Sequence, residues 1–271
     1  MPRRVFAAKP GKPRRMRLMS YNILSGGTGR IDPLAEIIRQ ADADVVILPE
    51  ACDTELLALL ARRLGMEYFA ACNPKNPAFA VGVLSRLPLR SAVNLSAMVP
   101  ELSKAAALVQ VAVGGQIWQI VGVHLHHYET PDDEAQRLRE WTALQPYLAP
   151  LPDTTGPVLL AGDFNANHPA QPFDPALLRP KAQARIAPFG KRIPTELVAQ
   201  ILAAGWVDAY AEGKPPAEWQ ASFSTRHPGQ RVDYIFIPPT LKSHLVRSWH
   251  HTDGLAKFAS DHFPVIAELR V

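Results

Sequence analysis

Polar residues follow strand-like apolar segments at several places in this chain. The segments "RLMSYN", "DVVILPE", "VGVHLHH" and "VLLAGDFN" are apolar for most of their length and end in amide, carboxylate or imidazole side chains. Two later segments, "RVDYIF" and "ASDHFPV", add further carboxylates and a histidine. An unpaired buried carboxylate costs several kcal/mol, so such residues persist where they have a partner or a function. The set is Asn22, Glu50, His124, His126, Asp163, Asn165, Asp233, Asp261 and His262.

This inventory of oxygen donors and histidines suits a divalent cation together with acid–base catalysis. Mg²⁺ prefers carboxylate oxygens and keeps waters that a phosphate can displace, and a metal held in this way stabilises charge developing on a phosphoryl oxygen. A histidine held by a carboxylate is oriented as a base near neutral pH, and Asp233 and His262 are the candidates for that pair. Asp261 is adjacent to His262 in sequence and is expected to project elsewhere, toward the metal or a second cation.

The spacing of these residues indicates which of them share a face. Residues two apart in a strand point to the same side, so His124 is expected beside His126, and Asp163 beside Asn165. Plain structural roles are also available, such as turn formation for Asn22 or a core hydrogen bond for His124. The recurrence of polar residues at one strand end after another favours a common site, because ligands of α/β sheets bind there.

The elements that must position these residues alternate between strand and helix in the first half of the chain. Asp32 is expected to cap the first helix, with Pro33 as its first helical residue. Asp53 or Thr54 is expected to cap the second helix, and Gly65 to end it. The expected order is strand 17–24, helix 32–43, strand 44–50 and helix 53–65.

The middle and the end of the chain are dominated by hairpin-like segments. Gly114–Gly115 predicts a turn between two strands, a helix is expected over 131–148, and residues 168–194 predict a long surface insertion. The pattern predicts an α/β (α+β) layered sandwich with helices outside. We expect a basic, disordered tail over residues 1–15 and a single domain over residues 16–271.

Composition sets limits on the function. Hydrophobic residues make up 47% of the chain and charged residues 20%, as in soluble globular proteins, and no apolar stretch is long enough to cross a membrane. Two cysteines and no signal-like segment favour a cytoplasmic protein. The net charge of +4 comes from the first 17 residues, which hold seven of the 29 Lys and Arg and no acid. Charge alone therefore does not predict nucleic-acid binding.

The ordered series "MSYNI", "DVVILPE", "VGVHLHH", "AGDFNA", "VDYIF" and "SDHFPV" resembles the endonuclease/exonuclease/phosphatase (DNase I-like) superfamily of metal-dependent phosphodiesterases. The resemblance extends from about Met16 to Val271. It implies a four-layer sandwich of two packed mixed β-sheets flanked by helices, with the site at one edge. It also implies Mg²⁺ or Mn²⁺ as the cofactor.

The resemblance assigns roles to individual residues. It implies that Glu50 is the principal metal ligand, with Asn22 beside it and Asp261 near the metal. His124 would contact the scissile phosphate, and Asn165 would hold it. Asp163 would protonate or orient the leaving oxygen or the nucleophile. Asp233 would orient His262, which would activate water or stabilise the transition state.

One position departs from the family pattern. The family commonly has Gln just before the metal-binding glutamate, and here it is Pro49. Proline donates no ladder hydrogen bond and belongs at a strand end, so the departure bears on metal geometry. Weaker candidates for substrate binding are Arg226, Arg231 and His126.

The sequence leaves the substrate open. A phosphodiester hydrolase acting on nucleic acid leads, because basic residues of the 168–194 insertion could follow a phosphate backbone. A phospholipid or sphingomyelin phosphodiesterase or a phosphatase on the same fold, and a non-catalytic binding module, are the alternatives. A zinc hydrolase fails on spacing, since Tyr128 and Glu129 stand where "HLHH" would need Asp and His. No stable membrane insertion and no obligate protein partner are expected.

Overall fold

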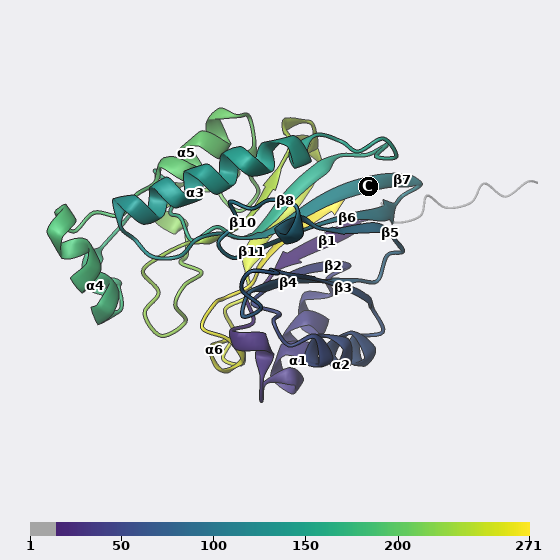
Figure 1. Ribbon diagram of the computed structural model, residues 1–271, viewed down its shortest axis with the longest axis horizontal. Coiled ribbons are helices and arrows are strands. Elements are labelled where there is room, and N and C mark those ends of the chain that lie inside the picture. The colour runs from purple at the N-terminus through teal and green to yellow at the C-terminus, as the bar shows by residue number, and fades with distance from the viewer. Residues whose placement is uncertain (1–14) are drawn as a thin grey trace, which may run out of the picture.

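The computed structural model describes residues 15–271; the tail predicted over residues 1–15 therefore lies, except for Arg15, outside the described residues. Two six-stranded sheets pack face to face, and helices cover both outer faces (Figure 1). Both sheets mix parallel and antiparallel neighbours. The predicted α/β four-layer sandwich is confirmed.

The strand order of each sheet brings distant parts of the chain together. The first sheet runs β11 (Leu245–His250), β12 (Val265–Arg270), β1 (Arg15–Ser20), β2 (Val45–Pro49), β4 (Ala80–Ser85) and β3 (Glu67–Cys72). The second runs β5 (Leu89–Asn94), β6 (Ala105–Val113), β7 (Gln116–His124), β8 (Val158–Asp163), β10 (Asp233–Ile237) and β9 (Val207–Asp208).

The helices divide between the two outer faces. The first sheet carries α1 (Ile31–Ala41), α2 (Thr54–Leu64) and the short α6 (Ala256–Ala259). The second carries α3 (Pro131–Leu144) and α5 (Glu196–Ala203). The insertion predicted over residues 168–194 contains α4 (Pro180–Ile186), which projects at one end of the sandwich (Figure 1).

The core between the sheets consists of strand residues that alternate inward, such as Leu18, Ile47 and Ile120. Burying one such side chain contributes roughly 1.5–3 kcal/mol. The two sheets are tightly packed at Gly122, where an added Cβ would lie 2.8 Å from Ile47 Cγ2. A larger residue at this position would push the two sheets apart.

The helix boundaries confirm one capping prediction and correct another. Asp53 caps α2 by accepting hydrogen bonds from the amides of Glu55 and Leu56, and Gly65 ends it in the left-handed conformation, as predicted. The prediction for α1 was wrong, because that helix begins at Ile31 and Asp32 lies within its first turn. Ile31 packs into the core beneath α1, so burial extends the helix past the residue expected to cap it.

Candidate active site

Strand register places three predicted site residues in one row across the second sheet. β7 runs parallel to β8 with His124 opposite Asp163, and β8 runs antiparallel to β10 with Asp163 opposite Asp233. The carboxyl ends of β7 and β8 therefore meet the beginning of β10 at one sheet edge. All three side chains are buried.

The residue before Asp163 explains part of the "AGDFN" motif. Gly162 has φ +148°, and a Cβ there would lie 2.0 Å from the carbonyl oxygen of Val123 on the neighbouring strand. Only glycine fits such a position. Gly162 therefore allows β8 to approach β7 closely just before Asp163.

His262 lies against this row from the loop before β12. Its Nδ1 is 2.8 Å from Asp233 Oδ2, and its Nε2 is 3.8 Å from Asp163 Oδ2 and 4.0 Å from Asp261 Oδ1. Phe223 packs its ring 4.5 Å from the imidazole. The sequence-predicted pairing of Asp233 with His262 is present.

Electrostatics within this cluster are strongly coupled. Burial raises the pKa of Asp163, and the neighbouring Asp233 carboxylate raises it further. Burial by itself lowers the pKa of His262, but the carboxylates of Asp233 and Asp163 outweigh it and raise that pKa to about 10. In the absence of a cation, His262 is therefore an imidazolium at neutral pH.

Asn22 and Glu50 come from the first sheet and reach the same edge. Asn22 Nδ2 donates to Glu50 Oε1 at 3.2 Å and to Asp163 Oδ2 at 3.0 Å, so one amide joins the two sheets. Its Oδ1 accepts from the amide of Leu24. In this orientation Asn22 presents donors to the carboxylates, and it would have to turn its amide over to offer oxygen to a metal.

Glu50 is held by its backbone as well as by its side chain. Its φ is +64°, which is unusual for a residue with a Cβ, and its carbonyl and Oε2 accept from the amides of Gly26 and Ser25, each at 2.8 Å. Pro49 is the last residue of β2, and its carbonyl accepts from Ile23. The proline thus lies at a strand end, where its missing donor is tolerated.

Asn165 follows β8 in a turn rather than in the strand. Its φ is +50°, its amide donates to Asp163 Oδ1 at 2.9 Å, and its Nδ2 donates to the carbonyl of Leu125 at 3.0 Å. The residue therefore fixes the Asp163 carboxylate and keeps its own Oδ1 for other contacts.

Lys104 belongs to this cluster, and the sequence analysis missed it. Its Nζ lies 2.6 Å from His124 Nε2, and among the described residues its ammonium has no ion-pair partner. Burial lowers the pKa of Lys104, and burial followed by the Lys104 charge lowers the pKa of His124. An ammonium has no lone pair, so a protonated Lys104 donates to His124 Nε2, and a neutral imidazole then carries its proton on Nδ1. The available signal was a lone lysine just before the apolar strand β6.

The cluster has the donor set that a divalent cation requires. Asp163, Asp233 and His262 each offer a ligand atom, and these atoms lie within 4.8 Å of one another. Asp233 Oδ1 and Asp261 Oδ1 are buried and have no hydrogen-bond partner. Carboxylate oxygens that are buried without a partner are costly unless a cation or a proton lies beside them. The residues present therefore fit a hard metal ion.

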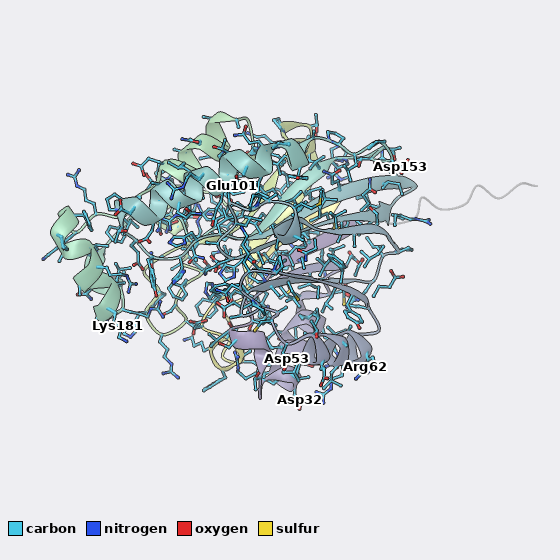
Figure 2. All side chains as sticks on the ribbon, viewed as in Figure 1. Asp32, Asp53, Arg62, Glu101, Asp153 and Lys181 are labelled. Atoms are coloured by element: carbon cyan, nitrogen blue, oxygen red, sulfur yellow. The ribbon has the colours of Figure 1, made fainter. Side chains whose placement is uncertain are left out.

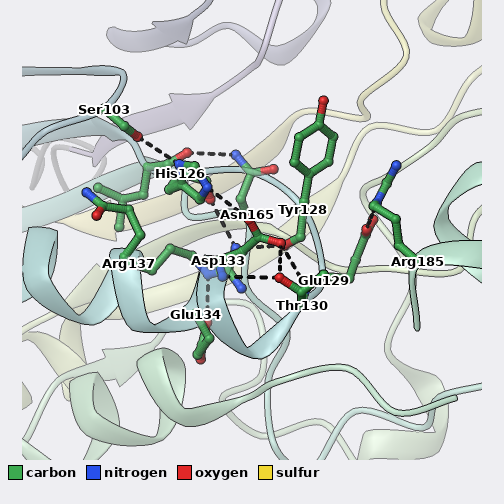
Figure 3. A network of polar contacts seen from close by, with 12 residues as sticks. Ser103, His126, Tyr128, Glu129, Thr130, Asp133, Glu134, Arg137, Asn165 and Arg185 are labelled. Atoms are coloured by element: carbon green, nitrogen blue, oxygen red, sulfur yellow. Dashed lines mark hydrogen bonds and ion pairs between the residues drawn. The ribbon is translucent and has the colours of Figure 1, made fainter. Parts of the chain in front are cut away.

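His126 does not join the site. Its Nδ1 is 3.1 Å from Ser103 Oγ, and its Nε2 is 3.0 Å from Asp133 Oδ1, the residue that closes the capping box of α3 with Thr130 (Figure 3). β7 ends at His124, so the face that the two histidines were expected to share does not continue to His126. Buried Arg137 fixes the following loop by donating to the carbonyls of His126 and Tyr128.

The two arginines proposed for substrate binding differ in environment. Arg231 is fully buried, donates to Asp208 Oδ2 at 2.6 Å and to Gln171 Oε1 at 3.1 Å, and packs against Trp219. It has no route to a substrate in solution. Arg226 is exposed and lines a cleft beside the site.

That cleft has a volume of about 980 Å³ and opens next to Asp261. It lies between α4, the loop around Arg226 and the α6 segment. Among the described residues, Asp261 is the only acidic one that lines it. The basic lining consists of Arg30, Arg179, Lys181, Arg185, Arg226 and Lys257. Lys181 stands on α4, far from Arg62 on α2 (Figure 2). The carboxylate–histidine cluster thus adjoins a strongly cationic surface.

Comparisons with solved structures reveal the same fold. A 3′–5′ exonuclease (NExo) from Neisseria meningitidis has a TM-score of 0.71 at 17% identity, covering 94% of this chain and 100% of that chain. An AP endonuclease from Archaeoglobus fulgidus has a TM-score of 0.66 at 14% identity, covering 94% and 100%. A humanized TDP2 from D. rerio has a TM-score of 0.64 at 17% identity, covering 95% and 99%.

Sequence comparison identifies the family. No curated protein matches the chain. The model of the Endonuclease/Exonuclease/phosphatase family matches residues 19–262, and this span includes every residue of the cluster described above. The family prediction is confirmed: the chain belongs to the endonuclease/exonuclease/phosphatase family of phosphoester hydrolases.

Proposed function

We propose that this protein is a divalent-metal-dependent phosphodiester hydrolase with a nuclease-like substrate. The observation that carries the proposal is the row of His124, Asp163 and Asp233, completed by His262 and opening beside a cationic cleft. A negatively charged diester in this cleft would bring its phosphorus to the carboxylate–histidine cluster.

The proposed reaction is direct attack of water on phosphorus. The new bond joins the water oxygen to phosphorus, the bond to the leaving oxygen breaks, the water proton passes to a base and the leaving oxygen receives a proton. Asp163 and His262 would exchange these protons, and Asp233 would orient His262 through Nδ1. Asn165 would hold the phosphate, and Lys104 would supply positive charge behind His124.

The proposed metal is Mg²⁺ or Mn²⁺. Glu50, Asn22 and Asp261 would hold it together with the unpartnered carboxylate oxygens of the cluster. When bound, the ion would neutralise charge on a phosphoryl oxygen.

Nucleic acid is the proposed substrate class because the cleft lining is almost entirely basic. One similar structure is a 3′ phosphatase from Neisseria bound to a product DNA hairpin, which adds support by analogy only. Arg226 stays a candidate phosphate contact. We do not propose Arg231 and His126 as substrate contacts, because their side chains are bonded to internal partners.

The alternatives to a nuclease are a phospholipid phosphodiesterase and a non-catalytic binding module. A phospholipid phosphodiesterase would need an apolar or aromatic surface for membrane contact. No helix among residues 15–271 combines the length and hydrophobicity that crossing a membrane requires. A non-catalytic module is disfavoured because the predicted site residues are all present.

We also propose the cytoplasmic location that the sequence predicts. Cell fractionation would check it.

The decisive experiment is a turnover screen of the purified chain with Mg²⁺, Mn²⁺ or EDTA. The substrates are plasmid DNA, an abasic oligonucleotide, RNA, sphingomyelin and a phosphoinositide, and His262→Ala is the control. We expect metal-dependent cleavage of a nucleic acid that the control lacks. Cleavage of lipid alone would reassign the substrate, and no turnover with any metal would contradict the hydrolase.

A further inference from the structure

We propose that Phe258 is a stacking platform for an unpaired nucleobase, so that the cleft takes single-stranded polynucleotide; this rests on the proposed function. Phe258 lines the cationic cleft and is 79% exposed. It is the most exposed large hydrophobic side chain in the described part of the chain. A phenylalanine left in water forgoes the stabilisation that burial would give, so its position favours a binding partner.

The local structure aims Phe258 outward and keeps it in place. In α6, Ala256 and Ala259 are fully buried one turn apart, which turns Phe258 away from the core. Arg30 Nη1 donates to the carbonyl of Ala259 at 2.8 Å. The platform is therefore anchored from below.

The platform is also connected to the loop that contains Asp261 and His262. Ser260 follows α6 directly, donates its hydroxyl to the carbonyl of Asn22 at 2.6 Å, and accepts from the amide of His262 at 3.3 Å. Phe258 precedes Asp261 by three residues. A base on Phe258 would belong to a nucleotide close to the phosphate held at the cluster.

The charges around Phe258 complement a phosphate backbone. Lys257 is its neighbour on α6, and Arg179, Lys181 and Arg226 line the same cleft; none of these four has an ion-pair partner among the described residues. Cationic grooves with aromatic platforms bind single strands, because an unpaired base has a free face and a base inside a duplex does not.

A lipid surface fits this region less well. The large hydrophobic side chains that are exposed in the described chain are Tyr68, Met98, Tyr128, Leu177, Phe189 and Phe258. Only Tyr128 and Phe258 of this group line the cleft, and Arg185 already stacks on the Tyr128 ring. Membrane-binding surfaces need a larger apolar face than one isolated ring.

The test is binding of fluorescent single strands to the full chain in EDTA, followed by anisotropy. One probe is oligo(dT) of about 12 nucleotides, within the usual site size; the other has the same length and backbone with abasic residues throughout. We expect Phe258→Ala to weaken oligo(dT) binding about 5- to 100-fold and to leave the abasic strand unchanged. Phe258→Trp should restore binding, and Tyr68→Ala, which removes an exposed aromatic elsewhere, should have no effect.

Each other outcome overturns the inference. Equal weakening of both probes would mean a structural role, and no weakening would mean that no base stacks on Phe258. Loss of binding to phosphatidylserine vesicles with unchanged oligo(dT) affinity would assign the residue to a lipid surface. Turnover with Mg²⁺, measured separately, tests the proposed function: cleavage without the Phe258 effect overturns only the platform, and base-dependent binding without cleavage overturns only the hydrolase.

Discussion

Two clusters of buried charged side chains, one around Arg231 and one around Asp163, differ in how their charges are neutralised. Around Arg231, one guanidinium pairs with one carboxylate, Asp208, and aromatic rings close over it. Around Asp163, carboxylates outnumber the cations near them, and Asp233 Oδ1 is left without a partner. In the first cluster the two charges neutralise each other, although Arg231 Nη2 has no hydrogen-bond partner, and we expect the pair to support the fold. In the second the excess of carboxylates favours uptake of a cation.

The largest effect is expected from a substitution in the cluster around Asp163. Asp163→Asn should lower turnover by roughly 10²–10⁴-fold, the usual range for a general acid or base, while the fold is retained. Steady-state kinetics with circular dichroism would measure both. Asp208→Asn is the matched control, and a comparable loss of turnover per folded molecule in that variant would contradict the distinction between the clusters.

The second prediction concerns Glu50, the proposed metal ligand, which follows a strand of the first sheet. Glu50→Gln should lower turnover by orders of magnitude and weaken metal affinity, because it removes a carboxylate from the donor set. Titration with Mn²⁺ followed by calorimetry measures the affinity. Unchanged affinity and turnover would remove Glu50 from the metal site.

Breaking the Arg231–Asp208 ion pair should lower the stability of the fold and leave turnover nearly unchanged. Arg231→Met leaves the buried Asp208 carboxylate unpaired, which typically costs about 3–5 kcal/mol of the free energy of unfolding. Turnover per folded molecule should change little. Denaturant unfolding of the variant provides the value, and an unchanged midpoint would show that the ion pair does not stabilise this fold.

A smaller effect is expected at the residue that the sequence analysis missed. Lys104→Met removes the donor to His124 Nε2 and should lower kcat by roughly 10- to 100-fold, since charge-assisted hydrogen bonds contribute about 1.5–3 kcal/mol. Lys75→Met, at an exposed loop position, is the control. If kcat is unchanged and only unfolding is affected, Lys104 has no part in the reaction.

A further expected effect is a pH dependence of stability. Because the folded pKa of His262 is raised to about 10, its contribution is complete below the unfolded pKa of about 6.5 and is lost as pH rises toward 10. In EDTA, the stability advantage of the wild type over His262→Gln should therefore shrink between these pH values. A constant difference across the range would contradict the Asp233–His262 coupling.

The sequence by itself determined the family, the layered fold and the residues of the cluster other than Lys104. Strand-ending polar residues such as Glu50 and Asp163 are visible in one dimension, because burial of each strand is encoded locally by its apolar run. The Gly114–Gly115 hairpin was equally readable, and both glycines have positive φ. The single-domain boundary and the individual catalytic roles stay predictions.

Only the tertiary structure decided which side chains lie at the candidate site or its cleft and which are bonded inside the fold. Arg231 and Arg226 look alike in sequence, yet one is sealed beside Asp208 and the other lines the cleft. Lys104 reaches His124 because β6 and β7 pair with Ala105 opposite His124. Such contacts depend on strand register and on the packing of distant segments, and local sequence does not encode the partner that a long, flexible side chain will find.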